Sequence, residues 1–159
     1  MGTICIQTAG EQETIALARS IAPLFAPGAV VLLDGEMGAG KTHFVKGVAE
    51  HFGYDGEVTS PTFTLANFYE SPGVTLLHMD LYRIEGIDEF NDLGLLEYFP
   101  ESVVLIEWGV KIADHLTEYL QVHINYHNHE KESRQIVFSG QGAEYEQMAE
   151  QIGKIVTHG

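Results

Sequence analysis

The pattern of hydrophobic and polar residues predicts strands and helices that take turns along most of the chain. Short apolar or alternating runs are typical of strands, and they cover residues 3–8, 29–34, 63–69, 74–79, 102–106, 119–126 and 134–138. Apolar residues recur at helical spacing over 11–25, 43–52, 87–99 and 143–156. A shorter helix or turn is expected over 112–116.

This order of elements predicts the fold class. Alternating strands and helices followed by a β hairpin indicate a single-domain α/β sandwich, with a mixed β-sheet flanked by helices, over residues 1–159. The runs 63–69 and 74–79 are separated by a short turn, so we expect them to form an antiparallel hairpin. Gly94 should weaken or break the helix expected over 87–99, and Pro100 should end it.

A glycine-rich stretch between the second strand and the second helix carries the strongest chemical signal. It reads Gly-Glu-Met-Gly-Ala-Gly-Lys-Thr and fits G-x-x-x-x-G-K-[ST], the P-loop pattern. Strand, glycine loop and helix are the context that supports a P-loop NTPase fold. The residues expected to surround a nucleotide's phosphates are Gly35, Glu36, Met37, Gly38, Ala39, Gly40, Lys41 and Thr42.

Each residue type in this loop has a physical purpose. Glycines let successive backbone N–H groups point at phosphate oxygens, and the start of the helix adds unpaired N–H groups and a positive dipole end. Lys41 would place a positive charge on the phosphates and take part in catalysis, and Thr42 would offer its hydroxyl to Mg²⁺. No Asn-Lys-x-Asp element is present, which favours ATP over GTP.

Two carboxylates stand where a P-loop protein needs a metal-site acid. Asp80 follows the apolar run 74–79, and Glu107 follows 102–106. Carboxyl ends of parallel strands meet at one edge of a sheet, next to the P-loop. Both acids are therefore expected to be catalytic and to lie near the metal, one through a bound water and one orienting the attacking water. The alternative for either acid is a solvated strand end.

Three further groups of residues could belong to a functional site. The hydroxyl-rich residues Thr59, Ser60 and Thr62 could add a Mg²⁺ or γ-phosphate contact and become ordered with triphosphate, or could form an ordinary loop. Trp108 could stack on a base or belong to the core. A histidine cluster at 123, 127 and 129 has no recognised ligand spacing, so a structural metal is not expected there.

The composition limits which partners and which cellular compartment can be expected. The net charge is −15, which argues against a protein that grips nucleic acid or an anionic membrane by itself. The only cysteine is Cys5, so no internal disulfide can form. With no signal-like segment and no long apolar run, we expect a cytoplasmic protein that binds no membrane.

Taken together, the motifs resemble one family. The P-loop, Ser-Pro-Thr-Phe-Thr-Leu at 60–65, His-Met-Asp-Leu-Tyr-Arg at 78–83 and Leu-Ile-Glu-Trp at 105–108 stand in the order seen in the TsaE (YjeE) family. That resemblance implies a P-loop ATPase that uses ATP and Mg²⁺ to support threonylcarbamoylation of the adenosine beside the anticodon of certain tRNAs. It further implies the TsaD–TsaB heterodimer as the partner, with tRNA reached only through that complex.

The same resemblance assigns roles to residues. Lys41 and Thr42 match the phosphate and metal residues, and Asp80 and Glu107 match the acidic site residues. Thr62 lies in the segment expected to switch, and Trp108 neighbours the site. His43 stands where the family usually has Thr or Ser, next to the expected α-phosphate position, so this is a departure from the pattern.

Two other functions stay open on the residues alone. A small-molecule kinase usually has an arginine-rich lid, whereas this chain has only Arg19, Arg83 and Arg134. A nucleotide-dependent binding module would hydrolyse ATP only incidentally. Within the chain Arg83 is the best candidate for an arginine finger; otherwise a partner would complete the site, and hydrolysis by the isolated protein should be slow.

Overall fold

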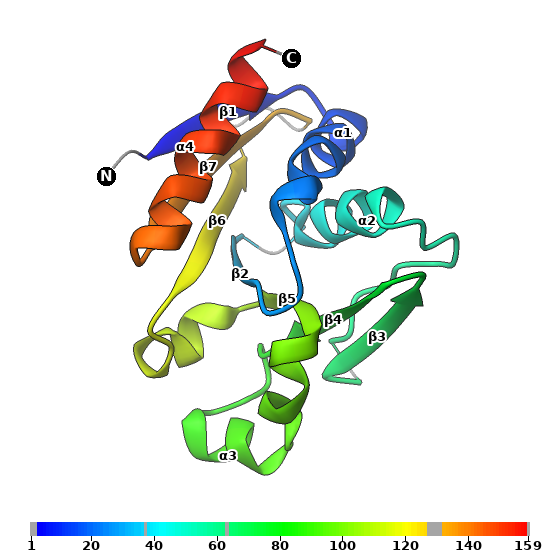
Figure 1. Cartoon of the computed structure of the whole chain (residues 1–159), viewed down its shortest axis with the longest axis vertical. Helices are drawn as coiled ribbons and strands as arrows, with labels where there is room; N and C mark the ends of the chain where they lie inside the picture. Colours follow the sequence, from blue (N-terminus) through cyan, green and yellow to red (C-terminus); the bar gives the residue numbers. More distant parts are fainter. Residues whose placement is uncertain (1–2, 37, 63, 127–131, 159) are drawn as a thin grey trace.

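A computed structural model describes residues 3–36, 38–62, 64–126 and 132–158 as one seven-stranded sheet with helices on both faces (Figure 1). The strands are β1 (Ile4–Thr8), β2 (Val30–Gly35), β3 (Ala66–Ser71), β4 (Val74–Asp80), β5 (Ser102–Glu107), β6 (Tyr119–Tyr126) and β7 (Arg134–Gln141). The α-helices are α1 (Glu11–Ile21), α2 (Lys41–His51), α3 (Ile87–Asp92) and α4 (Ala143–His158). Short 3₁₀ helices follow at η1 (Ala22–Leu24), η2 (Leu95–Glu101) and η3 (Gly109–His115).

The sheet is mixed, as the sequence predicts. Its order is β1-β7-β6-β2-β5-β4-β3. The central strands β6, β2, β5 and β4 are parallel to one another, whereas β7 pairs antiparallel with β6 and β1, and β3 pairs antiparallel with β4. The hairpin expected between β3 and β4 is confirmed. Parallel pairing brings the carboxyl ends of β2, β5 and β4 to one edge, with Asp80 directly opposite Glu107.

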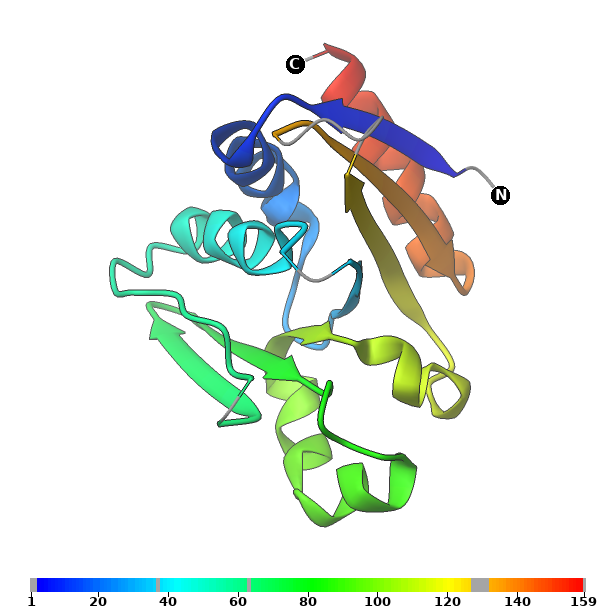
Figure 2. The ribbon, with the colours of Figure 1, turned by 180° about the vertical axis from the view of Figure 1, so that it is seen from behind.

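Alternating side chains of the central strands fill two separate cores. Val103 and Leu105 of β5 pack with residues of α1, α2 and α4 on one face. Val104 and Ile106 pack with residues around α3, η2 and η3 on the other face. Every residue of β5 is buried, and its middle residues 103–106 form a continuous apolar run. Figures 1 and 2 show α1 and α2 on one side of the sheet and α3 on the other. The α/β sandwich fold is thus confirmed.

The helix that follows the P-loop is fixed by close contact with α1. A Cβ atom built on Gly47 would lie 2.3 Å from the carbonyl oxygen of Ile15, a distance that no side chain tolerates. Glycine therefore lets α1 and α2 approach closely at this point. Helix α1 therefore anchors α2, and with it the end of the P-loop.

Several element ends differ from prediction. The break expected at Gly94 is confirmed, since this residue adopts a left-handed φ of 69° between α3 and η2, but the part that follows it is a 3₁₀ helix and not an α-helix. Pro100 lies inside η2 and does not end it. The first α-helix ends at Ile21 and tightens into η1, because Pro23 has no N–H to continue the helical bonding.

None of the helices within the described ranges is both long enough and apolar enough to cross a membrane.

Candidate functional site

The loop between β2 and α2 has the backbone geometry of a phosphate cradle. Gly35, Gly38 and Gly40 adopt left-handed φ values of 137°, 81° and 115°. At Gly35 a Cβ atom would lie 1.9 Å from the carbonyl oxygen of Ile124 on β6, so only glycine allows the chain to turn there. Helix α2 begins directly after Gly40, which points its first N–H groups at the loop.

Lys41 is a nearly buried cation at the centre of this loop. Its side chain donates a hydrogen bond from Nζ to the Gly35 carbonyl at 2.8 Å, and Nζ lies 4.5 Å from the centre of the Trp108 ring. Burial lowers the pKa of the Lys41 ammonium below its ordinary value, while the charges of Glu107, Asp80 and Asp34 oppose that shift. A partly desolvated cation of this kind favours an anionic ligand.

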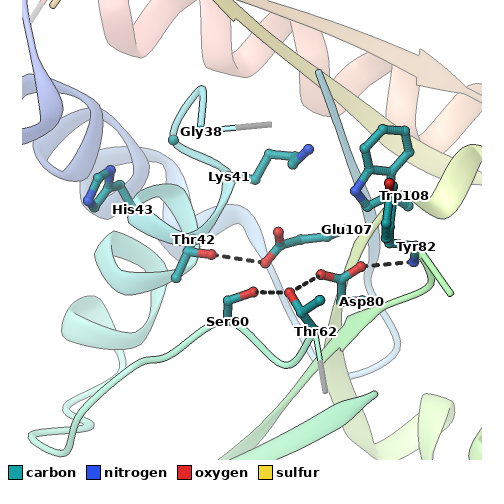
Figure 3. Close-up of a pocket in the computed structure, with 11 residues that line it drawn as sticks. Gly38, Lys41, Thr42, His43, Ser60, Thr62, Asp80, Tyr82, Glu107 and Trp108 are labelled. Atoms are coloured by element: carbon teal, nitrogen blue, oxygen red, sulfur yellow. Dashed lines mark hydrogen bonds between the residues drawn. The ribbon is translucent and has the colours of Figure 1, made fainter. Parts of the chain in front are cut away.

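Asp80 and Glu107 face the loop from the ends of β4 and β5. Both are almost fully buried, with 4% of each residue exposed. The Thr42 hydroxyl donates to Glu107 Oε2 at 3.2 Å, and the Thr62 hydroxyl donates to Asp80 Oδ2 at 3.0 Å. The backbone N–H of Tyr82 donates to Asp80 Oδ1 at 2.9 Å (Figure 3). The P-loop, both acids and the hydroxyl-rich segment therefore meet in one place.

These residues line a cleft of about 310 Å³ (Figure 3). Its lining consists of Gly38, Gly40, Lys41, Thr42, His43, Ser60, Thr62, Asp80, Tyr82, Glu107 and Trp108. Of the other predicted loop residues, Gly35 and Ala39 are buried and Glu36 is exposed. Met37 lies outside the described residues.

Trp108 and His43 both line the cleft and both have a second environment. Trp108 adopts a left-handed φ of 60°, its ring centre lies 5.2 Å from that of Tyr82, and it also packs partly against the core around α3. His43 Nε2 lies 3.1 Å from Glu11 Oε2 at the start of α1. Trp108 therefore belongs both to the core and to the site, the two alternatives that the sequence left open.

The β6–β7 hairpin supports the P-loop through residues that sequence reasoning missed. Tyr126 donates a hydrogen bond from its hydroxyl to the Gly38 carbonyl at 3.1 Å, and Arg134 donates from Nε to the Ala39 carbonyl at 2.8 Å. The guanidinium carbon lies 4.2 Å from the centre of the Tyr126 ring. The two residues pair directly across the hairpin. No motif marks them, because only the three-dimensional fold brings this hairpin to the loop.

His78 is a second residue whose role the motif alone did not reveal. It is completely buried, and its Nε2 lies 2.5 Å from Glu107 Oε2. Arg83, the best candidate within the chain for an arginine finger, is not part of the cleft lining, which contains no arginine among the residues that the structure describes.

The donor set fits Mg²⁺ bound together with phosphates. Thr42, Asp80 and Glu107 offer hydroxyl and carboxylate oxygens, the hard ligands that Mg²⁺ prefers. Across the described ranges no group of three or more His, Cys, Asp or Glu residues could hold a metal ion. Mg²⁺ usually takes one or two carboxylates and completes its shell with phosphate and water. In the histidine cluster, His123 lies 3.1 Å from Asp34, and the two others lie outside the described residues.

Comparison with known proteins agrees with the motifs. Residues 8–136 match the model of the family described as "Threonylcarbamoyl adenosine biosynthesis protein TsaE". The chain is 41% identical over 150 residues to the tRNA threonylcarbamoyladenosine biosynthesis protein TsaE of Bacillus subtilis, covering 93% of this chain and 92% of that one. It is 43% identical over 109 residues to the protein of that name from Treponema pallidum, covering 68% of this chain and 80% of that one.

A solved structure shows the same fold. The crystal structure of Bacillus subtilis YdiB superposes with a TM-score of 0.77 at 36% identity, covering 96% of this chain and 95% of that one. Sequence, fold and family model therefore agree over most of the chain. We conclude that this chain belongs to the TsaE family.

Proposed function

We propose that this protein binds ATP with Mg²⁺ and hydrolyses it to support formation of threonylcarbamoyladenosine in tRNA. The observation that carries the proposal is the hydrogen bond between Thr42 of the P-loop and Glu107 at the end of β5. It joins the expected phosphate and metal residues in one cleft, with Asp80 paired beside Glu107 in the sheet. The biosynthetic role follows from family membership and from the names of the relatives.

The roles of the residues follow from their positions. The backbone N–H groups of Gly38–Lys41 and the Lys41 ammonium bind and orient the phosphates. Thr42 and Glu107 would hold the metal, and the buried carboxylate of Asp80 would orient the attacking water. When bound, Mg²⁺ neutralises phosphate charge as the γ-phosphate is transferred to water.

The remaining parts of the proposal concern partners. We infer that the protein acts on the TsaD–TsaB heterodimer and meets tRNA only in that complex, since a net charge of −15 disfavours direct tRNA binding. The described cleft lining has no arginine, so a charge-stabilising group from the partner would raise the rate. The isolated protein should therefore hydrolyse ATP slowly.

A reconstituted threonylcarbamoylation system that lacks only this component tests the proposal. Adding the wild-type chain should restore multiple turnovers, and Lys41→Ala should not. Lys46→Ala, an exposed lysine on the same helix, is the matched control and should behave as wild type. Equal rescue by Lys41→Ala would refute the proposal, and a phosphorylated small molecule among the products would favour the kinase alternative.

A further inference from the structure

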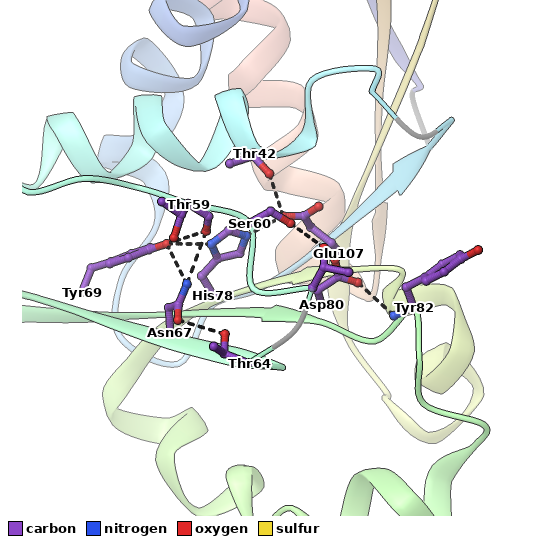
Figure 4. A network of polar contacts seen from close by, with 11 residues as sticks. Thr42, Thr59, Ser60, Thr64, Asn67, Tyr69, His78, Asp80, Tyr82 and Glu107 are labelled. Atoms are coloured by element: carbon purple, nitrogen blue, oxygen red, sulfur yellow. Dashed lines mark hydrogen bonds and ion pairs between the residues drawn. The ribbon is translucent and has the colours of Figure 1, made fainter.

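A continuous chain of hydrogen bonds runs from the P-loop through the interior of the sheet to the hydroxyl-rich segment (Figure 4). Glu107 Oε2 accepts from Thr42 and lies 2.5 Å from His78 Nε2. The other ring nitrogen of His78, Nδ1, lies 3.0 Å from the Tyr69 hydroxyl. That hydroxyl also donates to the carbonyl oxygen of Thr59 at 3.1 Å.

The residues in the middle of this row of hydrogen bonds are buried. His78 is fully buried, and Tyr69 and Glu107 are each 4% exposed. Buried polar groups that lose a partner cannot turn to water instead, so the partners on either side of His78 depend on it. The ring therefore fixes the direction of the Glu107 carboxylate and the position of the Tyr69 hydroxyl at the same time.

The hydroxyl-rich segment is attached to both acids of the site. At one end the Thr59 carbonyl accepts from Tyr69 and from Asn67 Nδ2, the latter at 3.3 Å. Three residues later, the Thr62 hydroxyl donates to Asp80. Any movement of residues 59–62 must change the hydrogen bonds of Tyr69 or of Asp80.

We propose that His78 and Tyr69 are positioning residues that couple the Glu107 carboxylate to residues 59–62. They hold Glu107 in the orientation that Thr42 and a metal require, and they anchor the hydroxyl-rich segment to that orientation. Ordering of the segment and metal binding at Glu107 then favour each other. The identity of the ligand rests on the proposed function, whereas the coupling is a property of the protein alone.

Tyr69→Phe tests the coupling by removing one oxygen atom. In the ligand-free protein we expect faster hydrogen exchange of the Leu65 amide, whose N–H donates to the carbonyl oxygen of Pro61 in this segment at 2.7 Å. We also expect the Mg²⁺ concentration needed for half-maximal ATP binding to rise about tenfold, as for other residues that support metal ligands. Affinity for ATP without Mg²⁺ should not change. Trp108, the only tryptophan, lies in the cleft and reports binding by fluorescence.

Tyr145→Phe is the matched control. Its hydroxyl is also buried and accepts the backbone N–H of Val30, and neither residue lines the cleft, so its loss should lower stability without changing exchange of the Leu65 amide or the Mg²⁺ dependence. Wild-type behaviour of Tyr69→Phe in both measurements would overturn the coupling. If the wild-type protein fails to bind Mg²⁺ and ATP, the proposed function fails, and the exchange experiment still decides the coupling.

Two substitutions of His78 test the hydrogen bond to Glu107 and the hydrogen bond to Tyr69 separately. A glutamine amide reaches the Nε2 position and an asparagine amide reaches the Nδ1 position. His78→Gln should therefore keep most of the Mg²⁺ affinity while exchange of the Leu65 amide becomes faster. His78→Asn should lose Mg²⁺ affinity by about tenfold and keep the Leu65 amide protected. Identical behaviour of the two variants would contradict the proposal, and the pair decides the matter if Tyr69→Phe does not fold.

Discussion

The cleft has two walls that are made in different ways. The P-loop wall is built from backbone, with left-handed glycines, helix N–H groups and carbonyls held by Tyr126 and Arg134. The opposite wall, formed by Asp80, Glu107 and the segment that contains Thr62, is built from side chains in a hydrogen-bonded network. Steric space fixes the first wall, and the hydrogen-bond partners of each carboxylate fix the second.

The difference predicts how each wall fails. A change that closes space in the P-loop wall should remove nucleotide binding altogether and also destabilise the fold. A change in the carboxylate wall should leave phosphate binding and weaken only the part that depends on the metal. Substitutions in each wall therefore test whether the two walls differ in this way.

Gly35→Ala should have the largest effect. Its Cβ would meet the Ile124 carbonyl, and its φ is unfavourable for alanine, so we expect the free energy of unfolding to fall by about 2–5 kcal/mol and ATP binding to be lost. Urea unfolding and calorimetric titration measure both. Gly73→Ala is the control, because its φ of 83° is also positive but nothing lies near the added atom. A loss no larger than about 1 kcal/mol at Gly35 would show that the P-loop wall is not sterically fixed.

Glu107→Gln should have the next largest effect. The amide keeps the size of the side chain but not its charge, so the gain in ATP affinity on adding Mg²⁺ should fall about 10–100-fold. Titrations with and without Mg²⁺ measure the gain. Glu101→Gln, an exposed residue outside the cleft, should leave it unchanged. An equal loss with and without the metal would mean that Glu107 supports the fold of the cleft and not the metal.

Tyr126→Phe should have a moderate effect on the P-loop wall. Loss of one hydrogen bond to the Gly38 carbonyl costs about 1 kcal/mol, which corresponds to about fivefold weaker ATP binding. Because this wall contacts phosphates, the loss should be the same with and without Mg²⁺. A loss seen only with Mg²⁺ would place Tyr126 with the carboxylate wall instead.

The smallest effect concerns alkaline pH. Burial raises the pKa of Tyr69 and of Tyr145 above the ordinary value of about 10. Below that pH both phenols are neutral whether the chain is folded or unfolded. Above it the unfolded chain loses these protons first, so the free energy of unfolding falls as pH rises. Urea unfolding of Tyr145→Phe between pH 9 and about 11 should show a shallower fall than wild type; an unchanged slope would contradict the shift at Tyr145.

More of the P-loop wall than of the carboxylate wall could be predicted from the sequence, because local motifs can be seen in a sequence and contacts between distant residues cannot. The P-loop is local in sequence, so its pattern gives the geometry directly. The meeting of Asp80 and Glu107 was also predictable, because adjacent parallel strands end together. The roles of His78 and Tyr69 depend on which side chains face each other inside the sheet, and those of Tyr126 and Arg134 depend on where a distant hairpin lies. Neither leaves a pattern in the chain, whereas the break at Gly94 was predictable, because glycine weakens a helix locally.

Calorimetric titration of ATP into Lys41→Ala and Glu107→Gln, with and without Mg²⁺, tests the two-wall site most directly. Lys41→Ala should lose binding under both conditions, since the proposal places the Lys41 ammonium on the phosphates themselves. Glu107→Gln should bind ATP as wild type does without Mg²⁺ and lose only the gain that the metal adds. Wild-type affinity of either variant in the presence of Mg²⁺ would contradict a nucleotide and metal site in this cleft.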